Sequence, residues 1–194
     1  MTKLTSLCVF CGSRIGEDPA HAREGEKLGR SLAERGVRLV YGGGGIGMMA
    51  VVANAAIAAG GAVTGIIPEF LRAYEVGTVA GADEIVVQGM HERKAKMFEI
   101  SDAFVVLPGG LGTLDESIEI TTWKQLQQHD KPIIFVNTNG YWDPYFALID
   151  RVIEGGFGHH KVRDLFQVVS GVNEIFAAVD SAPDVDNVVL TSHL

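Results

Sequence analysis

The feature that most constrains the fold is a regular alternation, along almost the whole chain, of short β-branched runs and longer segments with helical periodicity. Glycine or proline bounds most of the runs, and the alternation is typical of β-α-β units. Right-handed crossovers in such units place helices on both faces of one parallel sheet. The predicted strands are Ser6–Cys11, Arg38–Tyr41, Ala62–Ile67, Glu84–Val87, Ala103–Leu107 and Ile133–Val136. The predicted helices lie near Pro19–Glu34, Gly47–Ala59, His91–Ser101, Thr113–Gln128 and Pro144–Glu154.

The alternation predicts an α/β fold of the Rossmann-like type, a doubly wound parallel sheet with helices on both faces. A chain of 194 residues suits one domain, which we assign to residues 1–180. Residues 181–194 ("SAPDVDNVVLTSHL") have no clear place in this core, so we expect a loosely ordered C-terminal tail.

The formal net charge of −8 argues against nucleic acid as the main partner, because no cationic excess is present to displace counterions from a phosphate backbone. No basic and then apolar leader opens the sequence, and no apolar stretch approaches the roughly 20 residues that cross a bilayer. We therefore expect a soluble, cytoplasmic protein that binds no membrane.

Cys8 and Cys11 have the C-x-x-C spacing of redox and zinc sites. They lie inside the predicted first strand, however, where residues three apart point to opposite faces of the sheet. No second cysteine pair is present to complete a metal site. The sequence thus predicts two core thiols and no metal site.

Three strand-to-helix turns are rich in glycine: "CGSR" (Cys11–Arg14), "YGGGGIGMM" (Tyr41–Met49) and "PGGLGT" (Pro108–Thr113). In a parallel sheet all three lie at the carboxyl edge, where glycine allows close backbone approach and helix N-termini attract anions. Together they favour a phosphate-bearing ligand and make residues 1–180 a nucleotide-binding domain. The ligand-binding residues predicted from these turns are Ser13, Gly43, Gly44, Gly45, Gly109, Gly110, Leu111, Gly112 and Thr113.

The second turn also fits the dinucleotide fingerprint G-x-G-x-x-G through Gly42, Gly44 and Gly47. That fingerprint needs an acid at the end of the next strand, and the nearest candidate, Glu69, follows Pro68 in an apparent turn. NAD binding therefore stays a second hypothesis. No Gly-Lys-Ser/Thr follows a glycine run, which argues against a Walker-type ATP site.

Glu116 has two interpretations. Thr113-Leu114-Asp115-Glu116 matches the S/T-x-x-E capping box, in which the glutamate only closes the helix start. Alternatively, Glu116 stands at the ligand edge of the sheet, where phosphate would repel it and a sugar would not. Asp115 in the same turn would at least interact favourably with the positive end of the helix dipole.

Arg93 lies in "MHERKAKMFEI" (Met90–Ile100), where it shares a helical face with Met90 and Met97. An arginine within an apolar stripe is not ordinary solvated surface. It needs a buried partner, either a structural carboxylate or a ligand anion.

These segments resemble those of a known family. "PGGLGTLDE" is similar to the signature P-G-G-x-G-T-x-x-E, and "MHERK" to the segment M-H-x-R-K, of the LOG ("lonely guy") proteins. Those proteins are cytokinin riboside 5′-monophosphate phosphoribohydrolases, often mislabelled lysine decarboxylases. The resemblance runs from "CVFCGS" to "WKQLQQHDKPI" and so covers most of the chain.

The resemblance implies a Rossmann-like homodimer that needs no metal or cofactor. It would hydrolyse the N-glycosidic bond of adenosine 5′-monophosphate or an N6-modified form, giving the free base and ribose 5-phosphate. By motif match, Arg93 and Glu116 take the catalytic positions. Glu75, Lys94, the turn from Gly110 to Glu116 with Leu114 and Asp115, and Thr122 take substrate positions. Asp115 stands where many members carry glutamate, a conservative difference.

Two rival functions remain at this stage. A nucleotide- or cofactor-binding carrier could use the same turns without cleaving its ligand, and an NAD-dependent oxidoreductase would release no free base. Pyridoxal-dependent decarboxylation has no support, because it needs a Schiff-base lysine and the glycine turns contain none.

The segment "IEITTWKQLQ" also favours a homodimer. Its larger side chains spread more widely around the predicted helix than one stripe facing the sheet requires. They are Ile118, Thr121, Thr122, Trp123 and Leu126.

Overall fold

The computed structural model describes residues 4–72 and 79–183. The strands are β1 (Ser6–Phe10), β2 (Arg38–Tyr41), β3 (Val63–Pro68), β4 (Asp83–Val87), β5 (Ala103–Val106), β6 (Ile133–Val136) and β7 (Gln167–Val169). The α-helices are α1 (Pro19–Glu34), α2 (Gly47–Ala58), α3 (Glu69–Arg72), α4 (Met90–Glu99), α5 (Leu111–Gln125), α6 (Asp143–Glu154) and α7 (Ile175–Asp180). Short 3-10 turns are η1 (Thr138–Gly140), η2 (His160–Leu165) and η3 (Val172–Glu174).

The seven strands form one parallel sheet in the order β4-β3-β2-β1-β5-β6-β7. The chain starts in the middle, winds outward to β4, and returns to the other side of β1 with β5. This is the doubly wound topology predicted from the alternation of strands and helices. The strand order reverses between β1 and β5, which is the position where such sheets bind ligands.

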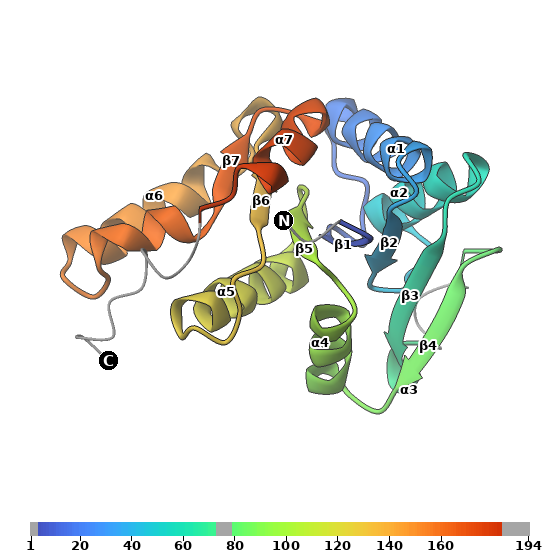
Figure 1. Ribbon diagram of the computed structural model, residues 1–194, viewed down its shortest axis with the longest axis horizontal. Helices are drawn as coiled ribbons and strands as arrows, with labels where there is room; N and C mark the ends of the chain where they lie inside the picture. Colours follow the sequence, from blue (N-terminus) through green and yellow to red (C-terminus); the bar gives the residue numbers. More distant parts are fainter. Residues whose placement is uncertain (1–3, 73–78, 184–194) are drawn as a thin grey trace.

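Helices cover both faces of the sheet (Figure 1). Side chains of α1, α2 and α7 pack with Leu7, Val9 and Leu39 on one face. Side chains of α4, α5 and α6 pack with Cys8, Phe10 and alternate residues of the neighbouring strands on the other. The central strands are buried on both faces, as their continuous apolar sequences predict.

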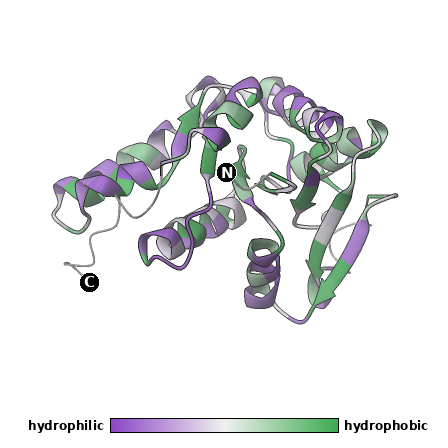
Figure 2. Ribbon diagram, in the orientation of Figure 1, coloured by the Kyte–Doolittle hydropathy of each residue, from purple (hydrophilic) through white to green (hydrophobic). Residues whose placement is uncertain are grey.

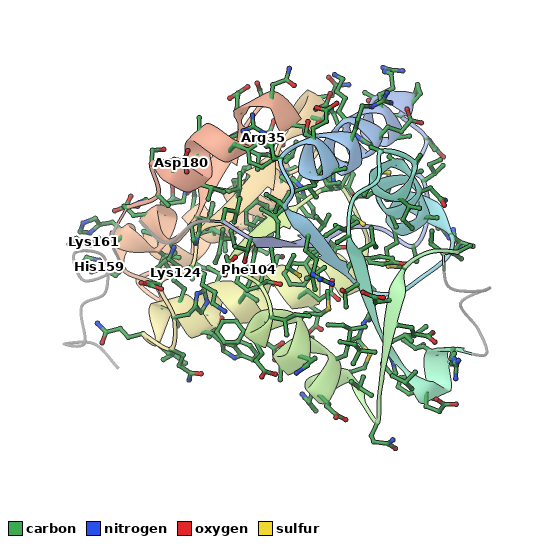
Figure 3. The ribbon with its side chains drawn as sticks, turned by 45° about the vertical axis from the view of Figure 1, so that its right-hand side comes forward. Arg35, Phe104, Lys124, His159, Lys161 and Asp180 are labelled. Carbon is green, nitrogen blue, oxygen red and sulfur yellow. The ribbon has the colours of Figure 1, made fainter. Side chains whose placement is uncertain are left out.

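An aromatic stack fixes the helices of the second face. Phe104 of β5 stacks between Phe10 of β1 and Phe98 of α4, with ring centroids 5.8 and 6.0 Å apart. Phe98 in turn meets Trp123 of α5 edge to face at 5.4 Å. Phe104 lies near the middle of the molecule, close to α5 (Figure 3). The stack thus joins α4 and α5 to the switch point of the sheet.

The two thiols confirm the strand prediction. Cys8 packs in the α4–α5 face and Cys11 in the α1–α2 face, and both are buried and free. Burial raises the pKa of Cys11, and the nearby Glu116 raises it further, so this thiol stays protonated. Among the described residues no group of three His, Cys, Asp or Glu side chains could hold a metal ion.

The structure differs from the sequence-based prediction at a few elements. It adds the strand β7 and the helices α3 and α7, which are too short to show a period. The segment after Pro68, predicted as a turn, is the helix α3. The last helix, α7, ends at Asp180. The domain bounds 1–180 stay a prediction, and residues 184–194 of the predicted tail lie outside the described part. No helix in the described ranges is long and apolar enough to cross a membrane.

Candidate active site at the switch point

The three glycine turns lie together at the carboxyl edge of β2, β1 and β5, as the sequence predicted. Gly12 N–H donates to the carbonyl of Pro108 (3.1 Å), and Met48 N–H donates to the carbonyl of Gly12 (3.0 Å). These bonds join the first turn to the third and the second. They close the turns around a cavity of about 160 Å³.

The cavity is lined by strand ends, by the first turns of α2 and α5, and by α4. Its lining residues are Val9, Cys11, Ser13, Gly42, Met49, Arg93, Gly110, Leu111, Gly112, Thr113 and Glu116. Seven of these were predicted from the sequence: Ser13, Arg93, Gly110, Leu111, Gly112, Thr113 and Glu116. The cavity therefore brings the two predicted catalytic residues and most of the third turn into one place.

The other predicted substrate residues lie outside this cavity. Gly43, Gly44 and Gly45 belong to the second turn but do not line it, and Gly109 lines an adjoining cavity of about 590 Å³. Leu114, Asp115, Lys94 and Thr122 are also absent from its lining. Glu75 lies outside the described residues. For these residues a substrate contact remains a prediction.

The helix start bears on the capping interpretation of Glu116. The helix α5 begins at Leu111, and its N-cap is Gly110, with extended backbone and no side-chain cap. Thr113 is therefore already the third helical residue, so Thr113 and Glu116 cannot form a capping box. The capping interpretation is wrong, because the helix starts three residues earlier than the capping box indicated, with Gly110 and not Thr113 as its N-cap. Glu116 instead lies in the cavity wall with a side chain only 9% exposed.

The same helix start supplies donors for an anion. The leading amides of an α-helix have no partner within the helix and carry the positive end of its dipole. In α5 these are the amides around Leu111, Gly112 and Thr113, all of which line the cavity. A phosphate at this position would accept several backbone hydrogen bonds.

Arg93 is buried beside Glu116, which confirms that this arginine is not a solvated surface residue. Its Nε donates to the carbonyl of Ile66 at 3.0 Å, and its Nη2 donates to the carbonyl of Gly42 at 2.7 Å. Both carbonyls belong to the β2–β3 side of the sheet. The guanidinium is thereby fixed to the sheet edge rather than to its own helix alone.

The remaining terminal nitrogen, Nη1, lies 3.9 Å from Oε1 of Glu116. This separation is too long for a hydrogen bond. Two opposite charges thus lie beside each other in the cavity wall, where both can face a ligand in the cavity.

Gly42 shows why the second turn matters for Arg93. A Cβ atom at Gly42 would collide with the guanidinium at Nη2. Sequence reasoning counted Gly42 only as part of the dinucleotide fingerprint. The sequence analysis also did not predict that Val9, Cys11 and Met49 line the cavity. An apolar residue at a strand end or a helix start looks the same in the sequence whether it lines a cavity or packs in the core.

The fold and the cavity define a Rossmann-like α/β protein. At the switch point it has a helix N-terminus suited to binding phosphate and a buried arginine–glutamate pair. A family model described as "Possible lysine decarboxylase" matches residues 49–179. The chain belongs to the LOG family covered by that model, whose curated members are named cytokinin riboside 5′-monophosphate phosphoribohydrolases.

The curated relatives are similar over most of this chain. A cytokinin riboside 5′-monophosphate phosphoribohydrolase of Oryza sativa subsp. japonica is 43% identical over 80% of this chain and 64% of its own length. Two such enzymes of Arabidopsis thaliana are 42% and 38% identical. They cover 90% and 97% of this chain and 82% and 83% of their own lengths.

Solved structures with the same fold include molybdenum cofactor proteins. The carrier protein of Chlamydomonas reinhardtii is 19% identical with a TM-score of 0.67, covering 93% of this chain and 98% of that one. The molybdenum cofactor binding protein of Rippkaea orientalis is 20% identical with a TM-score of 0.70 over the same shares. At this identity the likeness concerns the fold alone.

In the described part of the chain, the cavity is lined by no lysine that could carry out the decarboxylation named in the family description. Burial lowers the pKa of Lys124 to about 8, which is the kind of shift that Schiff-base chemistry uses. Lys124 lies eight residues beyond Glu116, however, about 12 Å further along α5. It donates to the carbonyl of Lys131 and does not line the cavity.

Proposed function

We propose that this protein hydrolyses the N-glycosidic bond of adenosine 5′-monophosphate or an N6-modified form, releasing the free base and ribose 5-phosphate. The observation that carries the proposal is the Arg93–Glu116 pair beside the α5 helix start in one cavity. The family to which the chain belongs supports the same reaction. The proposal needs no metal and no cofactor.

Cleavage of the bond between C1′ and N9 builds positive charge on the ribose, as in glycoside hydrolysis. Glu116, buried in the cavity wall, meets that charge, binds a ribose hydroxyl or orients the attacking water. The leading amides of α5 hold the 5′-phosphate and so set the sugar over the carboxylate. Arg93 places a fixed positive charge next to Glu116, where it supports either the phosphate or the departing base.

A carrier that binds without cleaving is the main rival, because carrier proteins share the fold. A carrier needs the phosphate-binding turns but has no need for a carboxylate facing a guanidinium at the sugar position. The pair therefore favours hydrolysis, and only turnover separates the two functions. An NAD-dependent oxidoreductase is less well supported, since the curated relatives are named phosphoribohydrolases.

We expect the 5′-phosphate to be essential for efficient hydrolysis. Adenosine should be cleaved with a kcat/KM roughly 10²-fold or more below that of adenosine 5′-monophosphate, because it lacks the group that the helix-start amides bind. Base release from both compounds, measured by chromatography under the same conditions, checks this. Equal rates would contradict the assignment of the turn to phosphate.

We also propose that the protein forms a homodimer through α5. Leu111, Ile118, Thr122 and Leu126 follow one another at helical spacing and are all exposed, Ile118 by 47% and Leu126 by 40%. Trp123 and Thr121 are not part of this surface, since Trp123 packs on Phe98 and Thr121 is buried. Thr122 lies on the exposed side of α5, so its predicted substrate contact would reach the cavity of a second subunit.

Light scattering at micromolar concentration should therefore report a dimer, and Ile118→Glu should give a monomer because it places a charge in an apolar interface. Leu148→Glu is the matched control, since Leu148 is also an exposed apolar residue (58%), and it lies on α6. It should leave the dimer intact. A monomeric wild-type protein would contradict this proposal.

A further inference from the structure

Tyr141 joins the segment after β6 to the third glycine turn. Its Oη donates a hydrogen bond to the carbonyl of Gly109 at 2.6 Å. Both residues line the adjoining cavity of about 590 Å³, and neither lines the candidate active-site cavity of about 160 Å³. Gly110, the next residue of the turn, lines both cavities. The hydroxyl therefore acts on a peptide that lies between the two cavities.

The bonded carbonyl fixes the direction of the next amide. A peptide unit is planar and trans, so its C=O and N–H groups point in opposite directions. The carbonyl of Gly109 and the N–H of Gly110 belong to one such unit. Since the carbonyl points toward Tyr141, the N–H points away from it, toward the candidate active-site cavity that Gly110 also lines. This N–H has no hydrogen-bond partner among the described residues, so a ligand can accept from it.

The peptide between Gly109 and Gly110 is free to turn unless something holds it. Turning it changes ψ of the first glycine and φ of the second, and glycine has no Cβ atom to resist either change. Packing explains only Gly109, where a Cβ atom would collide with Oγ1 of Thr113. At Gly110 φ is −99°, and a Cβ atom would meet no atom within 4 Å. Glycine at 110 instead leaves the backbone open to the close approach of a ligand.

The backbone on both sides of Tyr141 is held in place. The strand β6 before it is apolar (Figure 2) and buried. Beyond that strand, Nδ2 of Asn139 donates to Oδ2 of Asp18 at the start of α1, at 2.7 Å. The N–H of Trp142 donates to Oδ1 of Asn137, also at 2.7 Å. These bonds fix the segment that brings the phenol to the glycine turn.

The ring of Tyr141 is fixed as well. The rings of His21 and Trp142 meet it edge to face, with centroids 5.2 and 5.0 Å away. Burial does not account for the bond to Gly109, because Tyr141 is 42% exposed and its hydroxyl could hydrogen-bond to water instead. The phenol is thus aimed at one carbonyl of a turn that otherwise lacks stiffness.

We propose that Tyr141 is a positioning residue: its hydroxyl holds the Gly109 carbonyl and thereby keeps the Gly110 N–H directed into the candidate active-site cavity, where it binds the 5′-phosphate beside the leading amides of α5. The inference rests on the proposed function, which places the phosphate there. Tyr141 acts through the peptide, since its O–H is already donated to Gly109.

Tyr141→Phe tests the proposal, because it removes the hydroxyl and keeps the ring. We expect kcat/KM for adenosine 5′-monophosphate to fall by roughly 10- to 100-fold, the usual worth of a hydrogen bond to a charged group. For adenosine, which has no phosphate, kcat/KM should change by less than about twofold. Equal losses on the two compounds would mean a purely structural role, and no loss on either would mean that the peptide needs no support. Both outcomes overturn the proposal.

Tyr145→Phe is the matched control. Tyr145 lies on α6, only four residues further along the chain, and its hydroxyl interacts with Ser117 and Thr121 rather than with the turn. This variant should retain the wild-type ratio of kcat/KM for the two compounds. A loss confined to the nucleotide in Tyr145→Phe as well would show that the effect is not particular to Tyr141, and would overturn the proposal.

Inorganic phosphate tests the Gly110 amide without turnover. In protein labelled with ¹⁵N-glycine, phosphate should shift the amide signals of Gly110 and Gly112 in the wild type. In Tyr141→Phe the response of Gly110 should be lost, while that of Gly112, which lies within α5, should remain. The same Gly110 response in both proteins, or none in the wild type, contradicts the positioning role.

A crystal structure of Tyr141→Phe shows the peptide itself. We expect the Gly109 carbonyl to turn away from residue 141 or to adopt two orientations. A single orientation, identical to that of the wild type, overturns the inference. Absence of base release by the wild-type protein overturns the proposed function, whereas the phosphate titration and the crystal structure still judge the role of Tyr141.

Discussion

Glu116→Gln should lower kcat for base release by roughly 10² to 10⁴, the usual contribution of a positioned acid–base group. The amide has the size of the carboxylate but is neutral and a poor proton acceptor, so it cannot meet charge developing on the ribose. Nucleotide binding should survive or tighten, because one negative charge beside a dianionic ligand is gone.

The melting temperature of Glu116→Gln should shift by only about a few degrees. Glu116 does not cap α5, whose N-cap is Gly110, and its carboxylate stands 3.9 Å from the Arg93 guanidinium. The decisive pair of measurements is thus turnover and melting temperature on the same sample. A stable variant with near-wild-type turnover would show that Glu116 is only part of the cavity wall.

Arg93→Ala should cost both stability and activity. The substitution removes two hydrogen bonds to the buried carbonyls of Ile66 and Gly42 and leaves the Glu116 carboxylate without its neighbouring cation. Breaking a buried charged network in this way costs about 3–5 kcal/mol of the free energy of unfolding. Chemical denaturation measures that loss, and base release measures the loss of turnover.

Arg93→Lys provides the control for Arg93→Ala. Lysine keeps the charge but lacks the planar fork that reaches two carbonyls at once, so it should recover part of the stability and little of the rate. If Arg93→Ala were as stable as the wild type, the hydrogen bonds to Ile66 and Gly42 would not anchor the guanidinium, and the geometry of the cavity would need another origin.

Much of the fold follows from local sequence. The alternation of apolar runs and helical segments predicted six of the seven strands in the described residues, and the glycine turns predicted the edge of the sheet where the cavity lies, because both signals are short in range. The strand β7 has only three residues, and α7 has six, so neither shows a period. Their positions are set by packing against β6, which no local pattern records.

The sequence indicated which kinds of side chain lie in the cavity better than it indicated which residues contact one another there. The apolar surroundings of Arg93 in the sequence indicated a buried arginine, but its partners lie 27 and 51 residues away, at Ile66 and Gly42. The pattern T-x-x-E suggested a cap at Thr113, whereas the backbone had already become helical at Leu111. Motif matching likewise grouped Lys94 with Arg93, although adjacent helical residues point in directions about 100° apart and reach different partners.

The most direct test of the proposed hydrolysis is the product balance of the purified wild-type protein incubated with adenosine 5′-monophosphate and, separately, with an N6-prenylated form. Chromatography quantifies the free base, and an enzymatic assay quantifies ribose 5-phosphate, with Glu116→Gln treated in parallel. Equimolar base and ribose 5-phosphate from at least one nucleotide, with little from the variant, is the predicted result. Bound nucleotide that is recovered intact from the wild-type protein, with no free base from either compound, would contradict hydrolysis and leave a carrier in its place.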